Sequence, residues 1–507
     1  MSSSNYISIT QMPISLKLKT PNKTSSSSSS SPSYSPPYKL LIPSPRRASR
    51  LFLPFLAFFF LLNVLQVLLP PLSCKSYLDH LRRPRPLDEF WRWAQSGAPP
   101  VRPCLRFSEE YSAAPRGDGG RKYMMVVVSG GLNQQRNQII DAVVVARIID
   151  AVLVVPVLQV NQVWGDESEF GDIFDVGHFK EKLRDDVKVV TSLPATHLMR
   201  RRVRAPVMPF NAGEDWVRSN YVEKLSKDSV LLLRAFDSRL AKNLTSDLQK
   251  LRCKVAFEAL RFQRWIEEIA DRLVRRMEEE GPYMALHLRL EKDVWVRTGC
   301  HSGLGFKADL AIADERASKP EFLTSRTKIT PHQRYIAGLC PLNANEISWM
   351  LKGLGASRNT RIYWAGGEPF GGQDALDPLR SQFPKLFNKW NLARPGELDG
   401  LKTKPSVLAA LDYQVCLKSQ LFMASHGGNM ARSLQGHRTY KGYGKPLRPN
   451  KKLLVRLFTN TTLSDEEIKR KIKQIHAESS DSLYTNPNRD VIAYPIPHCM
   501  CTKEAGV

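Results

Sequence analysis

The feature that most limits the possible folds is an apolar strand, a glycine turn and a helix in direct succession. Tyr123 to Val128 reads YMMVVV, an apolar run of strand length, and Ser129-Gly130-Gly131 ends it. Asn133 to Ile149 follows with apolar residues at helical spacing, and Val152 to Val157 is a second apolar strand. Two strands joined by a helix form a βαβ unit, which predicts a parallel sheet with helices on its faces.

The second half of the chain repeats this alternation. A charged amphipathic helix over Phe257 to Glu280 is expected to end the first half. Beyond it the expected strands are Met284 to Leu290, Arg361 to Ala365 and Gln420 to Ala424, and the expected helices are Asn345 to Leu354, Val407 to Leu417 and one that begins at Asn429. We therefore predict an α/β chain with two Rossmann-like domains that face each other across a cleft.

The N-terminal region has a different composition. Residues 1–50 contain no Asp or Glu and are rich in Ser and Pro, which predicts a disordered tail. Residues 51–72 carry no charge, and a run of this length spans ~30 Å of hydrocarbon. We predict a transmembrane signal anchor there, with the tail in the cytosol. The alternative is an organelle transit peptide, since such leaders are also rich in Ser and poor in acidic residues.

Three further parts follow the tail and the anchor. A stem rich in Pro, Arg and Gly is predicted at 73–121, an N-terminal domain at 122–280 and a C-terminal domain at 281–502. The net charge of +25 favours anionic partners, which include phosphates, membrane surfaces, acidic glycans and nucleic acids. Charge alone does not choose among them.

The cysteines indicate an oxidising compartment. Beyond Cys74 they are scattered without Cys-x-x-Cys or zinc spacing, at Cys104, Cys253, Cys300, Cys340, Cys416, Cys499 and Cys501. Wide scatter favours disulfides, with one thiol left over unless Cys74 takes part. Sequons at Asn243 and Asn460 agree with a lumenal body.

The segment Ala285 to Asp293 carries the first candidate site. Leu286 and its apolar neighbours alternate with His287, Arg289 and Glu291, which in a strand places the polar residues on one face. An arginine at the carboxyl end of a strand can hold a phosphate through two parallel hydrogen bonds. The alternative is an edge strand with a solvated face and an Arg–Glu pair.

The glycine turn after the first strand is the second candidate. Gly130 and Gly131 allow a close approach of the backbone to a ligand, and Asn133 and Arg136 can donate hydrogen bonds to sugar hydroxyls or phosphate. The alternative is a polar cap of the following helix. The spacing fits neither G-x-G-x-x-G nor a P-loop, which disfavours NAD and ATP.

Two more strand ends attract attention. Ser425, Gly427 and Gly428 lie between a strand and a helix, which predicts a phosphate seat, and Asp412 one helix earlier can accept from a base or ribose hydroxyl. The alternative is a simple chain turn. Glu368, after Trp364-Ala365-Gly366-Gly367, is interpreted mainly as structural.

Two absences bear on the chemistry. The sequence has no Asp-x-Asp, so the usual carboxylate clamp for a metal and a nucleotide diphosphate is missing. Arginine, backbone N–H groups and helix ends would then meet the charge of a leaving diphosphate. It also has no G-x-S-x-G, which disfavours an α/β-hydrolase.

Four segments together resemble the plant O-fucosyltransferase family. They are GGLNQQRNQIIDAVVVARIIDAVLVVP (130–156), HLRLEKD (287–293), IYWAGGE (362–368) and LDYQVCLKSQLFMASHGGNMARSLQGHRTYKG (411–442). The resemblance implies a GT-B fold, GDP-fucose as donor substrate, inversion at the sugar, no cofactor and no metal. The predicted anchor fits a single-pass type II protein of the Golgi membrane with its body in the lumen.

The resemblance also implies roles for residues. Arg289 matches the arginine of the H-x-R motif, which holds the donor diphosphate and stabilises its departure, and His287 belongs to the same motif. Asn133 matches the asparagine of the glycine-rich loop near donor and acceptor. Ser425 with its glycines matches the turn on the phosphate side, and Asp412 is similar to an aspartate that contacts the nucleoside.

Two departures keep other interpretations open. Gly130 stands near the place where some members carry a glutamate base, so the base is unassigned. Val294 to Arg297 replaces the run common after Asp293, which can alter the acceptor pocket. The leading function is fucose transfer to a protein or glycan. The alternatives are a transferase for another sugar, related to rhamnose or mannan, and a catalytically silent glycan-binding partner. The anchor and the lack of an aromatic-basic motif disfavour nucleic acid as a partner.

Overall fold

The computed structural model describes residues 89–93, 101–115, 122–160, 165–228, 230–323, 329–444, 446–460, 462–478 and 489–502. The predicted tail at 1–50 and anchor at 51–72 lie outside these residues. Within the described part, no helix combines the length and the apolar composition that a membrane crossing requires.

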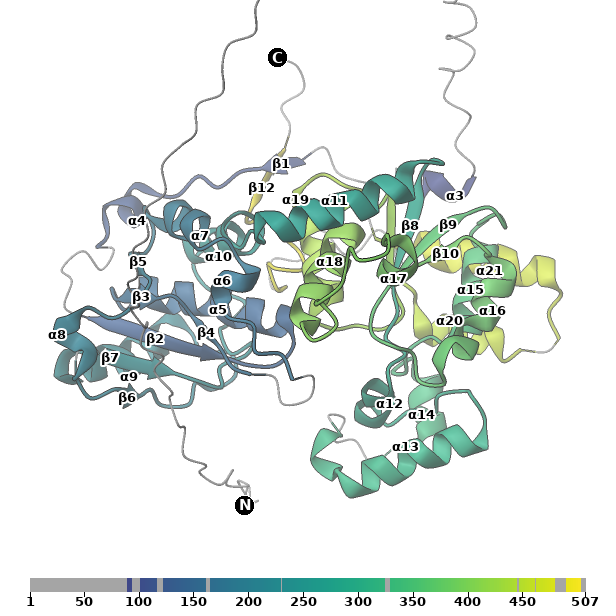
Figure 1. The fold of residues 1–507 in the computed structure, drawn as a ribbon, viewed down its shortest axis with the longest axis horizontal. Coiled ribbons are helices and arrows are strands. Elements are labelled where there is room, and N and C mark those ends of the chain that lie inside the picture. Colours follow the sequence, from purple (N-terminus) through teal and green to yellow (C-terminus); the bar gives the residue numbers. More distant parts are fainter. Residues whose placement is uncertain are drawn as a thin grey trace, which may run out of the picture. The chain divides into compact units, whose positions relative to one another are not determined.

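The N-terminal half is built on a parallel sheet with helices packed against it (Figure 1). The strand order is β5-β3-β2-β7-β6, and β4 also pairs with β2. The strands are β2 (Tyr123–Val128), β3 (Val152–Val154), β4 (Val157–Leu158), β5 (Val189–Val190), β6 (Val203–Arg204) and β7 (Val230–Leu233). The helices are α4 (Glu109–Ala113), α5 (Leu132–Ile148), α6 (Phe170–Ile173), α7 (Val176–Leu183), α8 (Ala195–Leu198), α9 (Glu214–Asp228), α10 (Ser246–Lys254), a π-helix η1 (Val255–Ala259) and α11 (Arg264–Glu278).

The C-terminal half holds a second parallel sheet with the order β10-β9-β8-β11. Its strands are β8 (Tyr283–His287), β9 (Arg361–Ala365), β10 (Leu386–Phe387) and β11 (Leu421–Ala424). Its helices are α12 (Lys292–Thr298), α13 (Phe306–Ser318), η2 (Pro320–Phe322), α14 (Pro331–Ile336), α15 (Ala344–Gly353), η3 (Gly372–Leu376), α16 (Asp377–Gln382), α17 (Lys389–Leu392), α18 (Pro405–Lys418), α19 (Asn429–Tyr440), α20 (Lys451–Phe458) and α21 (Asp465–Glu478). The predicted α/β class with two parallel sheets is confirmed.

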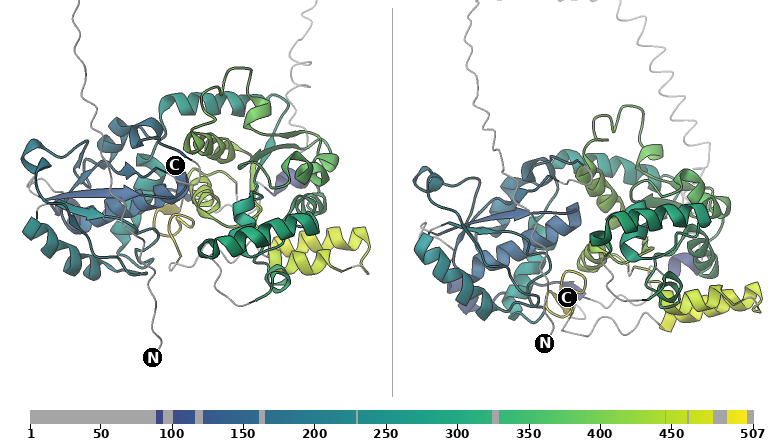
Figure 2. Two further views of the ribbon diagram at one scale, coloured as in Figure 1. Left: turned by 60° about the horizontal axis from the view of Figure 1, so that its bottom comes forward. Right: turned by 90° about the horizontal axis from the view of Figure 1, so that it is seen from below.

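Helix α5 joins the two halves. All of its residues except Gln134 and Asn137 are buried, because it packs on β2 and also contacts α18 and α19 of the second half. A helix that is buried all round belongs to the core. One continuous apolar cluster accordingly runs from β2 and α5 to one face of β8, which Tyr283 and Ala285 supply. Figure 2 shows the blue strands and helices around β2 and the green strands and helices around β9 as two groups.

Segments near the two ends cross the predicted domain boundaries. Strand β12 (Met500–Thr502) pairs antiparallel with β1 (Val101–Pro103), as Figure 1 shows. Disulfides Cys104–Cys501 and Cys253–Cys499 fix this pairing to the N-terminal half, and Cys300–Cys340 closes a loop in the C-terminal half. Helix α3 (Glu89–Arg92), inside the predicted stem, contributes Phe90 to the core of the C-terminal half. The domain limits themselves stay predictions.

Three expectations about elements are wrong in detail. The helix expected from Phe257 begins only at Arg264, because the chain leaves the helical conformation at Leu260 and Phe262 forms a bridge with Phe174. The strand expected over Met284 to Leu290 ends at His287. The edge-strand alternative is also wrong, since β8 lies between β9 and β11.

Candidate active site

Two neighbouring strand ends of the C-terminal sheet bring His287, Arg289 and Ser425 together. β8 and β11 are parallel, and Ala424 lies opposite His287 in the register. The Ser425 N–H donates to the His287 carbonyl at 3.0 Å, and the Ser425 hydroxyl accepts from the Arg289 N–H at 2.9 Å. These bonds fix the backbone of both predicted motifs beyond the carboxyl ends of the strands, where open α/β sheets bind their ligands.

The Arg289 side chain keeps unused donor capacity. Its Nε lies 3.6 Å from a carboxylate oxygen of Glu291, and neither that Nε nor that oxygen has a hydrogen-bond partner. The side chain is 31% exposed, and a Cβ added at Gly428 would lie 3.8 Å from its Nη1, so the turn after β11 passes beside the guanidinium. A guanidinium in this state can form two parallel bonds to a phosphate.

Glu291 belongs to the same corner. Its other oxygen accepts from the Gly367 N–H at 2.9 Å. Burial raises the pKa of Glu291, and the positive charge of Arg289 opposes that rise. Gly366, the preceding residue, is required there: its φ is +143°, and a Cβ would stand 2.5 Å from the Leu288 carbonyl. The turn after β9 therefore packs directly on the middle residue of the H-x-R motif.

His287 and His426 are neutral imidazoles. Burial lowers the pKa of His287 to about 3, and Arg289, His426 and Lys389 act in the same direction. Burial also lowers the pKa of His426 to about 3, helped by Lys451 and Arg289. His287 is 4% exposed, and its Nδ1 has no hydrogen-bond partner. An unpaired polar atom at this depth is rare and is available to a ligand.

Lys451 is a member of the site that sequence reasoning missed. Its Nζ lies 3.0 Å from His426 Nδ1 and donates to the Cys340 carbonyl at 2.6 Å. Burial lowers the pKa of Lys451 to about 8, and Glu346 opposes this shift. The residue begins α20, and no motif surrounds it in the sequence. Its contact with His426 arises only when α20 packs near the turn after β11.

Asp412 has its acceptors engaged by the protein. The Tyr363 hydroxyl donates to one oxygen at 2.7 Å, and the Gly366 N–H and Lys389 Nζ donate to the other at 3.1 and 2.8 Å. Lys389, which the sequence did not indicate, also donates to the Gly366 carbonyl at 2.8 Å. The Asp412 and Lys389 side chains thus bond to both the N–H and the carbonyl of Gly366 and fix the backbone of this turn. The predicted nucleoside contact of Asp412 stays a prediction.

The glycine turn of the N-terminal sheet is fixed by glutamines. Gln138 Nε2 donates to the Ser129 carbonyl at 2.8 Å, and Gln134 Nε2 donates to Asp237 at 2.7 Å. Gly130 has φ +89°, a left-handed conformation that favours glycine, and a Cβ there would also displace the Gln134 side chain, whose Oε1 would lie 2.1 Å away. Gly131 precedes the first residue of α5 as its N-cap. The predicted strand–turn–helix is confirmed in this segment.

Asn133 and Arg136 differ in what they can reach. The Asn133 amide oxygen is buried without a hydrogen-bond partner, so it can still accept one. Arg136 is 3% exposed, donates to the Ala256 carbonyl at 3.1 Å and lies 4.4 Å from the Tyr413 ring centroid. Its position on α5 turns Arg136 toward α18 and the core, where its Nε and Nη1 have no hydrogen-bond partner. The predicted contact of Arg136 with ligand stays a prediction.

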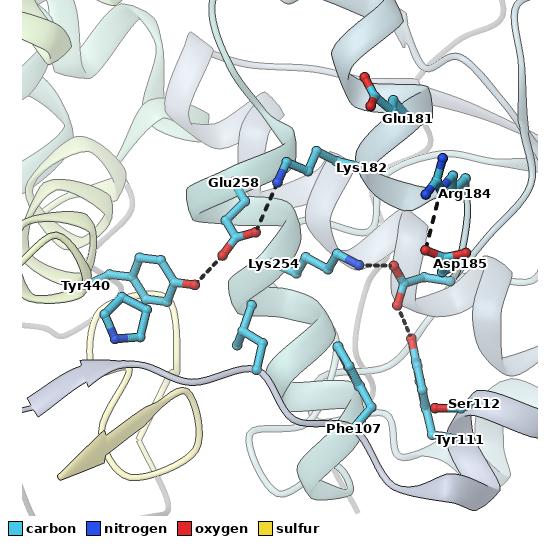
Figure 3. A pocket seen from close by; sticks show the side chains of 13 residues that line it. Phe107, Tyr111, Ser112, Glu181, Lys182, Arg184, Asp185, Lys254, Glu258 and Tyr440 are labelled. Carbon is cyan, nitrogen blue, oxygen red and sulfur yellow. Dashed lines mark hydrogen bonds and ion pairs between the residues drawn. The ribbon is translucent and has the colours of Figure 1, made fainter. Parts of the chain in front are cut away.

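A cavity of about 560 Å³ lies elsewhere (Figure 3). Several of its charged groups are paired with one another: Lys254 with Asp186 at 2.8 Å, and Lys182 with Glu258 at 3.8 Å. The Tyr440 hydroxyl also donates to Glu258 at 2.5 Å. None of the predicted site residues lines this cavity. We therefore place the candidate active site at the strand ends, where unused polar atoms and positive charge gather.

Two further predictions concern glycosylation and metal binding. Asn243 and Asn460 are both exposed, and Asn460 Oδ1 accepts from the Thr462 hydroxyl at 2.7 Å. Glycosylation of either stays a prediction. Over the described ranges, no three His, Cys, Asp or Glu side chains gather closely enough to hold a metal ion.

Comparison with known proteins assigns the family. Residues 123–441 match the family model described as GDP-fucose protein O-fucosyltransferase. The chain belongs to this family. Three relatives from Arabidopsis thaliana, O-fucosyltransferases 24, 20 and 37, are 52%, 51% and 53% identical to it. These alignments cover 81%, 81% and 82% of this chain and 72%, 72% and 74% of the relatives. The predicted family and the prediction of an O-fucosyltransferase-like enzyme are confirmed.

Solved structures with some similarity are much more distant. A structure of POFUT1 in complex with GDP-fucose is 14% identical, with a TM-score of 0.40, and the match covers 67% of this chain and 99% of that chain. A structure of NodZ alpha-1,6-fucosyltransferase soaked with GDP-fucose is 11% identical, with a TM-score of 0.34 over 61% and 91% of the two chains.

Proposed function

We propose that this chain transfers fucose from GDP-fucose to a hydroxyl group of a protein or glycan. Its family and its curated relatives carry this reaction in their names. One structural observation carries the proposal. Arg289 stands beyond the end of β8 with its backbone bonded to Ser425 and with a guanidinium Nε that has no hydrogen-bond partner.

The donor side of the reaction needs positive charge. The diphosphate leaves with the guanosine and gains charge as the glycosidic bond breaks. Arg289 can meet that charge with two parallel hydrogen bonds, and the Lys451 ammonium adds to the local positive potential through its contact with His426. These cations support a metal-independent reaction. The turn Ser425 to Gly428 supplies backbone at the start of α19 for the phosphates.

The acceptor side needs a positioned hydroxyl. The buried amide oxygen of Asn133 can accept a hydrogen bond from that hydroxyl and orient it toward the anomeric carbon. Attack from the face opposite GDP would invert the configuration of the sugar. Asn133 is not basic, so the group that takes the proton is unassigned. This division of roles fits the GT-B arrangement, in which two domains enclose the donor.

The compartment is also part of the proposal. The uncharged run at 51–72 would anchor the chain in the Golgi membrane as a single-pass type II protein. Three disulfides and two exposed sequons support a lumenal body, since disulfides persist in oxidising compartments. Fractionation of tagged full-length protein, with protease protection of the body in sealed vesicles, tests this assignment.

Titration calorimetry tests the donor. The full chain in detergent, with chelator present, is titrated with GDP, GDP-fucose, GDP-mannose, UDP-rhamnose and UDP-glucose. We expect binding of GDP and GDP-fucose and clearly weaker binding of both UDP sugars. Preference for UDP-rhamnose or GDP-mannose would assign another sugar. A folded chain that binds no nucleotide sugar would contradict the proposal and favour the silent glycan-binding alternative.

A further inference from the structure

Helix α13 turns an apolar face to the solvent. Ile312 is its single buried residue, whereas Phe306 is 81% and Leu310 is 49% exposed. Ala313 and Ala317 are exposed as well. These four residues follow the spacing i, i+4, i+7, i+11 and therefore form one stripe along the helix, which we call the α13 stripe. Figure 1 shows α13 on the outer side of α12 and α14, away from both sheets.

The side of α13 next to the stripe is held by polar contacts. Asp309 accepts from the N–H and the hydroxyl of Ser302 at 2.7 and 2.8 Å. Arg316 donates to the carbonyls of Trp295, Val296 and Cys300. Ile312 is the residue of α13 that joins the core of the C-terminal half, whereas Phe306 and Leu310 are exposed. Within the described residues, the α13 stripe is therefore not explained by packing of the chain on itself.

The stripe is asymmetric along its length. Its two large residues, Phe306 and Leu310, lie in the N-terminal half of the helix, and its two alanines lie in the C-terminal half. An antiparallel pair of identical helices would place Phe306 opposite Ala317 and Leu310 opposite Ala313. Large residues would then fill the space left by small ones in both directions, whereas a parallel pair would oppose Phe306 to Phe306.

Charge follows the same symmetry. Lys307 and Asp314 are exposed, are seven residues apart and flank the stripe on the same side, and neither forms an ion pair within the described part of the chain. In the antiparallel pair, Lys307 of each copy faces Asp314 of the other. A two-fold interface requires this kind of self-complementary patch, in which residue i contacts j and j contacts i.

We propose that α13 forms a homodimer by antiparallel pairing with α13 of a second copy. One helix pair buries less than the ~800 Å² per partner of a standard interface, so the dimer is weak in dilute solution and is strengthened where two chains share a membrane. Helix α12 begins directly after Glu291, which lies beside Arg289. Helix α12 and the disulfide Cys300–Cys340 therefore connect the α13 interface to the candidate active site. The proposal does not depend on which sugar is transferred.

Cysteine cross-linking of the full chain tests the orientation. Phe306→Cys and Ala317→Cys are made separately and mixed in equal amounts before mild oxidation. Within one helix these positions are about 16 Å apart, too far for an internal bridge, so a covalent dimer must join two copies. We expect the mixture to form a dimer on a non-reducing gel and each variant alone to form little. Efficient cross-linking of Phe306→Cys alone would contradict the antiparallel pairing.

A control position and a charge exchange complete the test. Leu339→Cys, which is also exposed, at 47%, but lies outside α13, should not cross-link with Ala317→Cys. In sedimentation equilibrium, Lys307→Glu should weaken the dimer about tenfold, and Lys307→Glu with Asp314→Lys should restore it. A chain that stays monomeric at all concentrations in detergent and forms no cross-link overturns the proposal and leaves the stripe to a different protein.

Discussion

The carboxyl ends of the two parallel sheets carry different chemistry. The C-terminal sheet gathers cations there: Arg289 beyond β8, Lys389 beneath the Gly366 turn and Lys451 against His426. At the N-terminal sheet, the turn after β2 offers amides, and its one arginine, Arg136, points into the core. Both sheets are parallel, although they differ in the number and order of their strands.

This difference separates two tasks. The cationic end can hold and stabilise a leaving diphosphate, whereas the amide-rich end can orient a neutral hydroxyl without attracting anions. It also shows that position at a strand end does not define a role. Asn133 and Arg136 lie one helical turn apart on α5. Asn133 keeps an unused acceptor, whereas Arg136 donates to the Ala256 carbonyl and lies against the Tyr413 ring.

The largest expected effect is on stability. Asp412→Ala leaves Lys389 buried without its carboxylate, which should cost about 3–5 kcal/mol because an uncompensated charge remains in the interior. Asp377→Ala, which removes an exposed pair with Arg380, should cost less than about 1 kcal/mol. Urea unfolding of the oxidised chain measures both. Equal effects of the two substitutions would contradict the buried role of Asp412.

Asn133→Ala tests the amide-rich end. We expect transfer activity to fall about 10- to 100-fold through loss of acceptor positioning. Binding of GDP and the unfolding midpoint should change little, because the Asn133 oxygen has no partner within the chain. A loss of GDP affinity as large as the loss of transfer would place Asn133 on the donor side instead.

Arg136→Met should behave in the opposite way. It removes the contact with the Tyr413 ring and the bond to the Ala256 carbonyl, so we expect a loss of about 1–2 kcal/mol of stability. The Michaelis constant for the acceptor should stay near that of the native chain. Should that constant rise while the unfolding midpoint stays fixed, Arg136 would be a ligand contact after all.

The smallest effect concerns pH. Lys451 has a pKa of about 8, below its ordinary 10.5, so its charge is present below pH 8 and is lost as the pH rises through that value. GDP affinity should fall about threefold above pH 8, roughly what one screened charge contributes. His287 and His426, each with a pKa of about 3, contribute no step of their own between pH 5.5 and 7.5, where the terminal phosphate of GDP itself titrates. Calorimetry from pH 5.5 to 9.5, with Lys451→Gln to remove the step, measures this dependence.

Regular periodicity made much of the fold predictable. The strands Tyr123–Val128 and Arg361–Ala365 lie where their apolar runs indicated, because buried parallel strands read as continuous apolar segments. The helix expected from Phe257 was wrong because amphipathic spacing continues through the π-helix and the extended residues before Arg264. Contacts between distant segments, not local pattern, interrupt that helix.

The site was predictable where a glycine turn follows a strand. Ser425 comes from such a turn and Arg289 from the segment directly after β8, and parallel pairing of β8 with β11 brings them together. Lys389 and Lys451 could not be found in this way, because each is brought to the site by contacts with residues more than twenty positions away in the sequence. The burial of Arg136 was also not predictable from the sequence, since a polar residue near a helix start gives the same sequence pattern whether its side chain points outward or inward.

The central claim is that Arg289 holds the leaving diphosphate. Its most direct test is the turnover of GDP-fucose by Arg289→Ala, Arg289→Lys and the control Arg358→Ala, in which an exposed arginine bonded to the Ser381 carbonyl is removed. We predict a fall in kcat of about 10²- to 10³-fold for Arg289→Ala, a partial recovery for Arg289→Lys and native turnover for the control. A folded Arg289→Ala variant with native kcat and native GDP affinity would contradict the account.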